Sequence, residues 1–369
     1  MTERITVHQE DKPIYEIVME SSFERLGNEF FSLGTSGRRI CIVSDSNVAA
    51  LYLEEVQSCL RPVCGQVDAW VFPAGEEQKT LDTVRSLYEY LILHHYDRSD
   101  FLVALGGGVV GDLCGFTAAT YLRGIRFIQV PTSLLAQVDS SIGGKTGVDF
   151  DAYKNMVGAF HMPSLVYVNT ATLRTLDAEQ FSSGMGEIVK HGLIKDSAYY
   201  GWLKEQMPAI MAREAGVCAE MVLGSDRIKR DVVEQDPTEK GERALLNFGH
   251  TLGHAIEKQM GFRLNHGQCV ALGCLAAAWI SAERGLISKA EVEDIRSTLR
   301  SFGLPVTIAG MKLDPEAVVC TAKSDKKMDR GQVKFILLKS PGCAFIDRSV
   351  NDDEMRSALR WLAGGSDEK

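Results

Sequence analysis

The chain has 369 residues and a formal net charge of −9, so its acidic balance argues against nonspecific nucleic-acid binding, which needs a basic surface. Hydrophobic residues make up 45% of the sequence and charged residues 24%, as is ordinary for a globular protein. No uninterrupted apolar run reaches about 18 residues, and we therefore expect no membrane-spanning segment.

The compartment can be inferred from the cysteines and from the first residues. Nine cysteines are scattered along the chain without a CxxC pair, a usage typical of reduced thiols. Residues 1–10 lack the apolar core of a signal peptide. We therefore expect a cytoplasmic protein, with room for two domains at this length.

The first half of the chain alternates short apolar runs with helical patterns. The apolar runs are 39–44, 69–72, 101–105, 127–130 and 165–168. Strands alternating with helices predict a Rossmann-like α/β domain with a mainly parallel sheet. Ligands of such sheets bind beyond the carboxyl ends of the strands.

A glycine-rich segment, 106–112, follows the third run directly. Gly106, Gly108 and Gly111 match GxGxxG, but the next run ends at 129–131 without the acidic residue that holds a ribose in a conventional Rossmann unit. Its backbone amides can cradle a pyrophosphate at a helix start. A tight strand-to-helix turn without a ligand explains the motif equally well.

A second glycine-rich segment carries positive charge. Residues 143–146 resemble the end of a P-loop, but Asp139 stands where that pattern needs a glycine, so the P-loop interpretation fails. Arg123, Lys145 and Lys154 lie nearby in an otherwise acidic chain. This local set predicts an anionic ligand, although each lysine alone is compatible with a solvated surface.

Helical patterns dominate from about residue 177, where we place the boundary between domains 1–177 and 178–369. The first of these patterns, 184–192, contains Glu187, Lys190 and His191 on one face. An ordinary surface ion pair would also explain Glu187 and Lys190.

The segment 243–257 repeats its apolar residues at helical spacing. Read as one helix, it places Arg243, Asn247, His250 and His254 on a single face. The chain has eight histidines, and three of them fall between residues 250 and 266, which favours a metal site. Thr251 follows His250, so the HExxH pattern of zincin proteases is absent.

Glu187 would complete a metal set with His250 and His266. Three protein ligands leave a fourth position open, as in catalytic zinc sites. His191 is a rival ligand, and the residues alone do not decide between the two.

Five motifs occur in an order that resembles the 3-dehydroquinate synthase family. They are 106–112, 137–147, 154–161, 186–190 and 247–257. The resemblance implies an NAD-binding α/β domain, a mainly α-helical domain that binds metal and substrate, and an active site between them. It further implies a cytoplasmic homodimer that uses NAD and zinc or cobalt.

The reaction implied by the resemblance belongs to the shikimate pathway of aromatic amino-acid and chorismate biosynthesis. This lyase would convert 3-deoxy-D-arabino-heptulosonate 7-phosphate to 3-dehydroquinate and phosphate. The reaction would proceed in four steps: transient oxidation by NAD, phosphate elimination, reduction, and intramolecular aldol cyclisation. The expected partner is thus a small phosphorylated sugar acid, with no nucleic acid and no membrane.

The family's functional residues transfer to this chain by motif position. The implied metal ligands are Glu187, His250 and His266. The implied NAD contacts are Asp45, Asn47, Glu76, Lys79, Gly108, Val109, Val110, Gly111, Asp112, Thr132, Ser133, Asp139, Lys145, Lys154, Thr172, Leu173, Arg174 and Thr175. The implied substrate-binding and catalytic residues are Arg123, Lys145, Asn155, Lys190, Lys229, Arg243, Asn247, His254 and Lys326 or Lys327.

Three positions depart from the family pattern. Gln268 replaces a glutamate that orients the third metal ligand, Asp149 replaces an asparagine, and Gly186 replaces an alanine. Two other enzyme classes share some of these features, namely a related sugar phosphate cyclase and a metal-dependent glycerol or alcohol dehydrogenase. A neutral polyol does not require so many lysines together, which favours the synthase.

Overall fold

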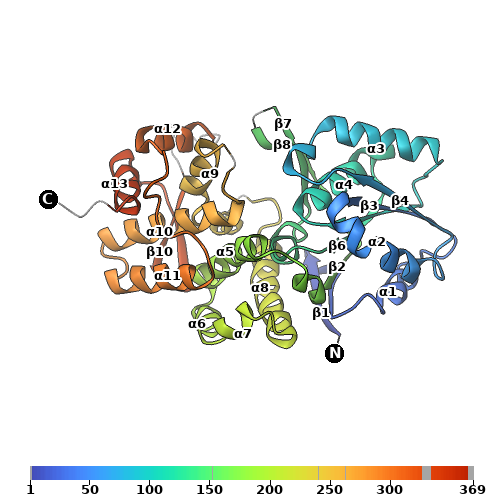
Figure 1. Ribbon diagram of the computed structural model, residues 1–369, viewed down its shortest axis with the longest axis horizontal. Coiled ribbons are helices and arrows are strands. Elements are labelled where there is room, and N and C mark those ends of the chain that lie inside the picture. Colours follow the sequence, from blue (N-terminus) through green and yellow to red (C-terminus); the bar gives the residue numbers. More distant parts are fainter. Residues whose placement is uncertain (1, 152, 240, 262, 326–333, 365–369) are drawn as a thin grey trace. The chain divides into compact units, whose positions relative to one another are not determined.

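The computed structural model describes residues 2–151, 153–239, 241–261, 263–325 and 334–364, and they form two compact units (Figure 1). The first unit comprises the described residues up to Leu176 together with Cys218–Arg230. The second comprises the remainder, from Asp177 onward. Helix α8 (Ala215–Gln235) therefore contributes its middle portion to the first unit.

A seven-stranded sheet in the order β1-β2-β9-β6-β5-β3-β4 forms the first unit. Its strands are β1 (Glu3–Gln9), β2 (Lys12–Glu20), β3 (Arg39–Asp45), β4 (Gln66–Phe72), β5 (Phe101–Gly106), β6 (Arg126–Pro131) and β9 (Leu165–Asn169). All neighbouring strands run parallel except the β1–β2 hairpin, which is antiparallel. The predicted mainly parallel sheet is thus confirmed.

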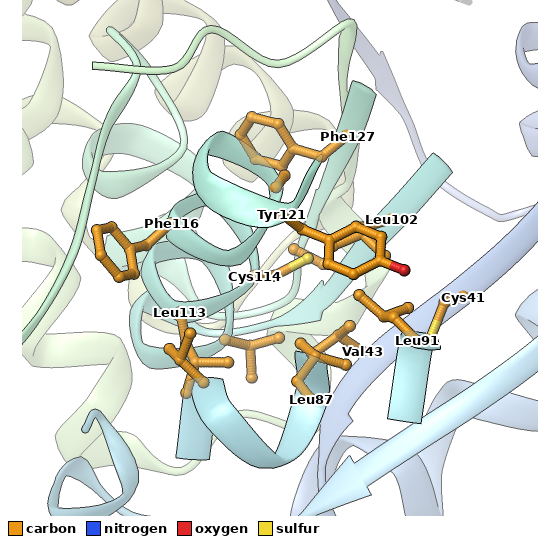
Figure 2. Packing of buried hydrophobic residues seen from close by; sticks show 14 of the residues in the cluster. Cys41, Val43, Leu87, Leu91, Leu102, Leu113, Cys114, Phe116, Tyr121 and Phe127 are labelled. Carbon is orange, nitrogen blue, oxygen red and sulfur yellow. The ribbon is translucent and has the colours of Figure 1, made fainter. Parts of the chain in front are cut away.

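Helices cover both faces of this sheet because its strands alternate their buried side chains between two cores. The helices are α1 (Leu26–Ser32), α2 (Ser46–Leu60), α3 (Leu81–Leu93) and α4 (Gly108–Thr120). On β3, Cys41 and Val43 pack with α3 and α4, in the cluster shown in Figure 2. Ile40 and Ile42 point the other way, into the core of α1 and α2. This period of two is what a strand buried on both faces requires.

Two hairpins lie outside the elements that the sequence predicts. One is the N-terminal β1–β2 pair, whose strand β2 pairs in parallel with β9. The other joins β7 (Lys145–Phe150) to β8 (Tyr153–Phe160) as a separate two-stranded sheet. The P-loop-like segment therefore leads into a strand rather than a helix, which agrees with the failure of the P-loop pattern.

The second unit is mainly helical, as predicted. Besides the hairpin of β10 (Phe335–Ser340) and β11 (Cys343–Asp347), it contains α5 (Ala178–Lys195), α6 (Ser197–Glu205), α7 (Met207–Met211), α9 (His250–Gln259), α10 (His266–Glu283), α11 (Lys289–Ser301), α12 (Pro315–Asp325) and α13 (Asp352–Leu362). Helix α10 is buried along most of its length and contacts α5, α9, α11 and α13. Within the described ranges, no helix combines the length and hydropathy needed to span a membrane.

The prediction of one continuous helix over 243–257 is wrong. A 3-10 helix covers Glu242–Asn247, and α9 starts only at His250. Between them, Gly249 adopts a left-handed conformation with φ of +80°, which no α-helix interior contains. A Cβ at Gly249 would lie 2.6 Å from Sγ of Cys274, so close packing against α10 requires glycine here.

Candidate active site

The predicted NAD residues of the first unit follow the carboxyl ends of five parallel strands. Asp45 ends β3, Glu76 and Lys79 follow β4, and Gly108–Asp112 follows β5. Thr132 and Ser133 follow β6, and Thr172–Thr175 follows β9. Because these strands are parallel, their carboxyl ends share one edge of the sheet.

The centre of this edge is the point where the strand order reverses. Strand β3 connects outward to β4, whereas β5 connects in the other direction to β6. The crevice at such a reversal is the usual ligand site of an open α/β sheet. The glycine-rich turn after β5 lies beside this position.

The start of helix α4 is suited to an anion. Its N-cap, Gly107, provides no side-chain hydrogen bond to the first backbone N–H groups. Unsatisfied N–H groups at a helix N-terminus favour phosphate. Gly111 also allows close packing, since a Cβ there would lie 2.8 Å from Oε1 of Gln129. The motif is thus both a tight turn and a fitting cradle for a pyrophosphate.

A charged cluster links the loop after β4 to α4 and β8. Nζ of Lys79, which is 4% exposed, lies 2.6 Å from Oδ2 of Asp112 and 2.5 Å from Oδ1 of Asn155. Burial lowers the pKa of Lys79, but the neighbouring carboxylates, Asp112 foremost, raise it overall. The lysine therefore remains a cation. Nearby, Nζ of Lys154 lies 3.3 Å from Oε1 of Glu76.

Asp149, one of the departures from the family pattern, fixes the backbone of this cluster. Its Oδ1 accepts a hydrogen bond of 2.7 Å from the backbone N–H of Asn155. Asn155 has a φ of +55°, a left-handed conformation that is costly for most residues. The carboxylate of Asp149 thus stabilises the backbone conformation in which Oδ1 of Asn155 contacts Lys79.

Some predicted cofactor residues also have structural roles. Oδ1 of Asp45 accepts hydrogen bonds from the N–H groups of Asn47 and Val48 and thereby caps α2. Oγ1 of Thr172 accepts a hydrogen bond from Nε2 of the buried Gln137.

The predicted substrate cations of the first unit occupy different elements. Lys145 begins β7 with an exposed side chain, and Arg123 is exposed in a short 3-10 helix. Lys229, in α8, is buried, and its Nζ lies 2.5 Å from Oδ1 of Asp139. The structure thus pairs Lys229 with a residue that the resemblance assigns to NAD.

In the second unit, the three predicted metal ligands converge on one point. Oε1 of Glu187, on α5, lies 3.6 Å from Nε2 of His250 and 3.4 Å from Nε2 of His266. These histidines come from the first residues of α9 and α10. Oε1 is buried, and among the described residues no hydrogen bond to it is formed, although the two imidazoles lie near. A divalent cation would satisfy this oxygen, so the three residues fit a metal.

His254 approaches the same point. Its ring centroid lies 5.0 Å from that of His250 and 5.6 Å from that of His266. Ring nitrogens of these three histidines fall within 4.8 Å of one another. In the described part of the chain, the rival ligand His191 is not a member of this histidine group, although one of its ring nitrogens lies within 4.8 Å of a carboxylate oxygen of Glu187.

Burial and neighbouring charges shift the pKa values of all three proposed ligands. Burial raises the pKa of Glu187, but Lys190 and the two imidazoles hold it well below its usual range, so the carboxylate is ionised. Burial and Lys190 lower the pKa of His250 far below its usual value, and the ring is neutral as a metal ligand must be. Burial also lowers the pKa of His266, but Glu187 and Glu257 raise it to about 10.

The interpretation of Glu187 and Lys190 as a surface ion pair is wrong. Their side chains are in contact, and both are buried, with Glu187 0% and Lys190 1% exposed. Helix α5 is covered along most of its length, so the shared face points inward. An ionised carboxylate at such depth needs compensating positive charge.

The remaining predicted substrate residues lie before α9. Nη1 of Arg243 donates to the carbonyl oxygen of Pro237 at 2.8 Å, and Nδ2 of Asn247 donates to Oε1 of Glu239 at 2.7 Å. Arg243 is only 2% exposed. Lys326 and Lys327 lie outside the described residues.

Glu257 is a site residue that the sequence reasoning missed. Its Oε2 lies 3.5 Å from Nδ1 of His266, on the side of the ring opposite Glu187. Its spacing of three from His254 was the available signal, because that spacing shares a helix face. Gln268, the position thought to orient His266, instead accepts a hydrogen bond from the backbone N–H of Asn265.

Comparison with known proteins identifies the family. The model of the 3-dehydroquinate synthase N-terminal domain matches residues 69–183, and that of the C-terminal domain matches residues 184–328. A 3-dehydroquinate synthase from Symbiobacterium thermophilum is 46% identical over 328 residues, which cover 88% of this chain and 91% of the relative.

Two solved structures share the fold across almost the whole chain. A 2-deoxy-scyllo-inosose synthase, complexed with carbaglucose-6-phosphate, NAD⁺ and Co²⁺, is 25% identical with a TM-score of 0.88 and covers 98% of this chain and 100% of its own. A 2-epi-5-epi-valiolone synthase from Streptomyces hygroscopicus, with NAD⁺ and Zn²⁺ bound, is 26% identical with a TM-score of 0.88 and covers 98% and 99%. With both family models matched in order and a relative of this identity, the chain belongs to the 3-dehydroquinate synthase family.

Proposed function

We propose that the protein is a 3-dehydroquinate synthase, which converts 3-deoxy-D-arabino-heptulosonate 7-phosphate to 3-dehydroquinate and phosphate. Membership of the family supports this activity. The structural observation that carries it is the convergence of Glu187, His250 and His266, with 3.4 and 3.6 Å between the carboxylate oxygen and the two imidazole nitrogens. Three ligands with an open position suit catalysis at a substrate oxygen.

The proposed cofactors are NAD and one divalent metal ion, zinc or cobalt. Related cyclases carry NAD⁺ with Co²⁺ or Zn²⁺, which supports this choice. When bound, NAD would accept and return a hydride, and the metal ion would polarise the substrate's hydroxyl and carbonyl oxygens. The uncapped start of α4 and the buried Oε1 of Glu187 fit these two groups.

The cationic residues would hold the anionic substrate. We propose that Lys145, Lys190, Lys229 and Arg243 contact its phosphate and carboxylate, since charge-assisted hydrogen bonds to these groups are strong. We assign the same function to Arg123, Asn155, Asn247, His254 and Lys326. Because the departing phosphate has its own basic oxygens, these residues mainly fix its orientation toward the proton that must be removed. Positioning of this kind contributes much of an enzyme's acceleration.

The domain assignment is also a proposal. Residues 1–177 would bind NAD, and residues 178–369 would bind the metal and most of the substrate. We further propose a cytoplasmic homodimer, on the strength of the family resemblance. Light scattering coupled to size-exclusion chromatography measures the mass and tests the dimer, because a single mass of one chain contradicts it.

The balance of NAD and phosphate tests the reaction. The full-length protein, a divalent metal, the heptulosonate phosphate and a trace of NAD should release many equivalents of phosphate per NAD. NADH should not accumulate, because the hydride returns to the substrate within each turnover. An analogue without the oxidisable hydroxyl should release no phosphate, since the ketone that acidifies the neighbouring C–H never forms.

A polyol or alcohol dehydrogenase gives the opposite balance. In that case NADH accumulates in step with product, and phosphate stays on the substrate. A related cyclase would instead release phosphate from a different sugar phosphate, while the heptulosonate phosphate stays unchanged. Chromatographic identification of the product as 3-dehydroquinate separates this outcome from the proposed activity.

A further inference from the structure

Helix α9 carries a row of three polar side chains along one face. His250, His254 and Glu257 are spaced by four and three residues, which places them on the same stripe of a helix. The stripe faces His266, the first residue of α10, since each of these side chains approaches that imidazole. Glu257 belongs to this row although the metal set does not include it.

His266 lies between two carboxylates that approach different ring nitrogens. Nε2 is 3.4 Å from Oε1 of Glu187, whereas Nδ1 is 3.5 Å from Oε2 of Glu257. Glu187 is 0% and Glu257 4% exposed, so neither carboxylate is strongly screened by water. In a buried site the dielectric is low, so a carboxylate at this distance interacts strongly with the imidazole ring.

The arrangement determines which nitrogen of His266 can bind a cation. Both ring nitrogens face a carboxylate, but only Nε2 lies toward Glu187 and His250, the other two proposed ligands. When a cation occupies that side, the one proton left on the ring is on Nδ1, where the carboxylate of Glu257 can accept it. The lone pair then resides on Nε2, the atom that faces Glu187 and lies near His250. A metal-binding histidine commonly donates its other N–H to a carboxylate, which fixes its tautomer and orientation.

Gln268 is not available for this function. Its Oε1 accepts a hydrogen bond of 2.9 Å from the backbone N–H of Asn265 and completes a capping box at the start of α10. An amide oxygen used in this way holds the helix end. It supplies no negative charge to the ring beside it.

We propose that Glu257 is the positioning residue of His266: it holds the Nδ1 proton and so directs Nε2 toward the metal, leaving position 268 free to cap α10. This inference rests on the proposed metal site. It explains how the chain dispenses with a glutamate at position 268. The carboxylate that orients the third ligand comes from α9 rather than from the ligand's own helix.

Metal affinity tests the proposal directly. Full-length wild-type protein and the variants E257Q, E257A and Q268E are stripped with a chelator, and Co²⁺ or Zn²⁺ is titrated against a chromophoric competitor. E257Q should weaken the affinity roughly 10- to 100-fold, the usual effect of losing such a partner, and E257A at least as much. Q268E should change it less than about threefold, because Glu257 already supplies the carboxylate that the ring requires.

Two further measurements separate positioning from a general structural effect. The visible absorption spectrum of the Co²⁺ form should shift in E257Q, because the geometry of the nitrogen ligand changes. The melting temperature of the metal-free E257Q protein should remain close to that of the metal-free wild type. A kcat that falls further than KM rises, at saturating metal, also indicates a displaced ligand.

The results distinguish this inference from the proposed function. If E187Q loses metal while E257Q binds it as tightly as wild type, the metal site stands and the function of Glu257 is refuted. A gain of affinity in Q268E that is larger than the loss in E257Q also overturns the proposal. If E187Q and wild type bind metal equally, the metal site itself is wrong and this inference falls with it.

Discussion

The backbone N–H of Gly267 donates a hydrogen bond of 3.1 Å to the hydroxyl of Ser183, and this bond joins the start of α10 to the first half of α5. The two helices approach so closely here that a Cβ at Gly267 would lie 1.8 Å from the carbonyl oxygen of Ser183. A Cβ at Gly186 would likewise lie 2.6 Å from the carbonyl oxygen of Gly267. Glu187 and His266 are the adjacent residues, so this contact sets the distance between two proposed ligands.

The substitution Gly267→Ala should therefore disrupt both stability and metal binding. The added methyl group meets backbone rather than a flexible side chain, and overpacking of this kind costs about 1–3 kcal/mol or more. Denaturant unfolding of the metal-free protein measures the change. Gly201→Ala is the matched control, because a Cβ at that helical position meets nothing within 4 Å. The control should gain up to about 1 kcal/mol from helix propensity, and equal effects in both variants would contradict the argument.

Each of the three proposed metal ligands should be required for both metal binding and activity. Replacement of Glu187, His250 or His266 by alanine is expected to remove the bound metal and the turnover, since three ligands are the minimum of an open catalytic site. Metal content per chain by mass spectrometry and phosphate release provide the two readouts. His191→Ala serves as the control because it tests the rival ligand. Full occupancy and full turnover in any one of the three variants would remove that residue from the set.

Lys145 should serve the substrate rather than the fold. Its side chain is exposed at the start of β7, and the loss of one charge-assisted contact is expected to weaken substrate binding by about 1.5–3 kcal/mol. Steady-state kinetics of Lys145→Ala, with a melting curve, measure both effects. Lys312→Ala, which removes another exposed lysine, should leave the kinetics unchanged. The assignment fails if the two variants behave alike.

Arg284 should make the second unit sensitive to acid. Its Nε and Nη2 lie 2.6 and 2.7 Å from the two carboxylate oxygens of Glu354, and this hydrogen bonding holds the pKa of Glu354 below its usual value. A lowered carboxyl pKa stabilises the fold above the unfolded-state pKa, about 4.3, and this contribution disappears as the pH falls through the folded-state value. Both side chains are partly solvated, so the contribution should be modest, on the order of 1 kcal/mol.

The unfolding free energy of Arg284→Met should thus fall below that of wild type at pH 7 and approach it below about pH 4. Arg61→Met is the control, because Arg61 pairs with Glu54 on an exposed helix surface and should cost little at either pH. Urea unfolding at several pH values measures these differences. A deficit in Arg284→Met that stays constant with pH would rule out the pair as its cause.

The elements that the sequence predicts well are those with strong local patterns. The apolar run that ends at Leu105, followed at once by glycines, determines a buried strand, a tight turn and a helix start by itself. Gly249 is different, since a glycine within a helical pattern fits both a continuous helix and a break. The break is determined by residues of α10 that are distant in the sequence but packed against Gly249, such as Cys274.

In the site, too, features that depend on spacing along one helix were predictable, whereas those that depend on tertiary packing were not. Spacing along one helix places His250 and His254 together, and the histidine cluster therefore predicts the metal set. The depth of Glu187 and Lys190 depends on how the other helices cover α5, which spacing does not report. The function of Glu257 depends on the orientation of one imidazole ring, and this is fixed only when α9 and α10 have packed.

The parallel pairing of β2 with β9 has a consequence for synthesis on the ribosome. The hairpin β1–β2 leaves the exit tunnel first, yet its partner strand β9 is made only after residue 164. At about 5–20 residues per second, the hairpin waits roughly 7–30 seconds before it can join the sheet. Arg230, whose Nη1 donates to the carbonyl oxygen of Thr6, arrives later still. The beginning of the chain is thus among the last parts of the first unit to become protected, and a nascent chain released before residue 165 should expose it to proteases.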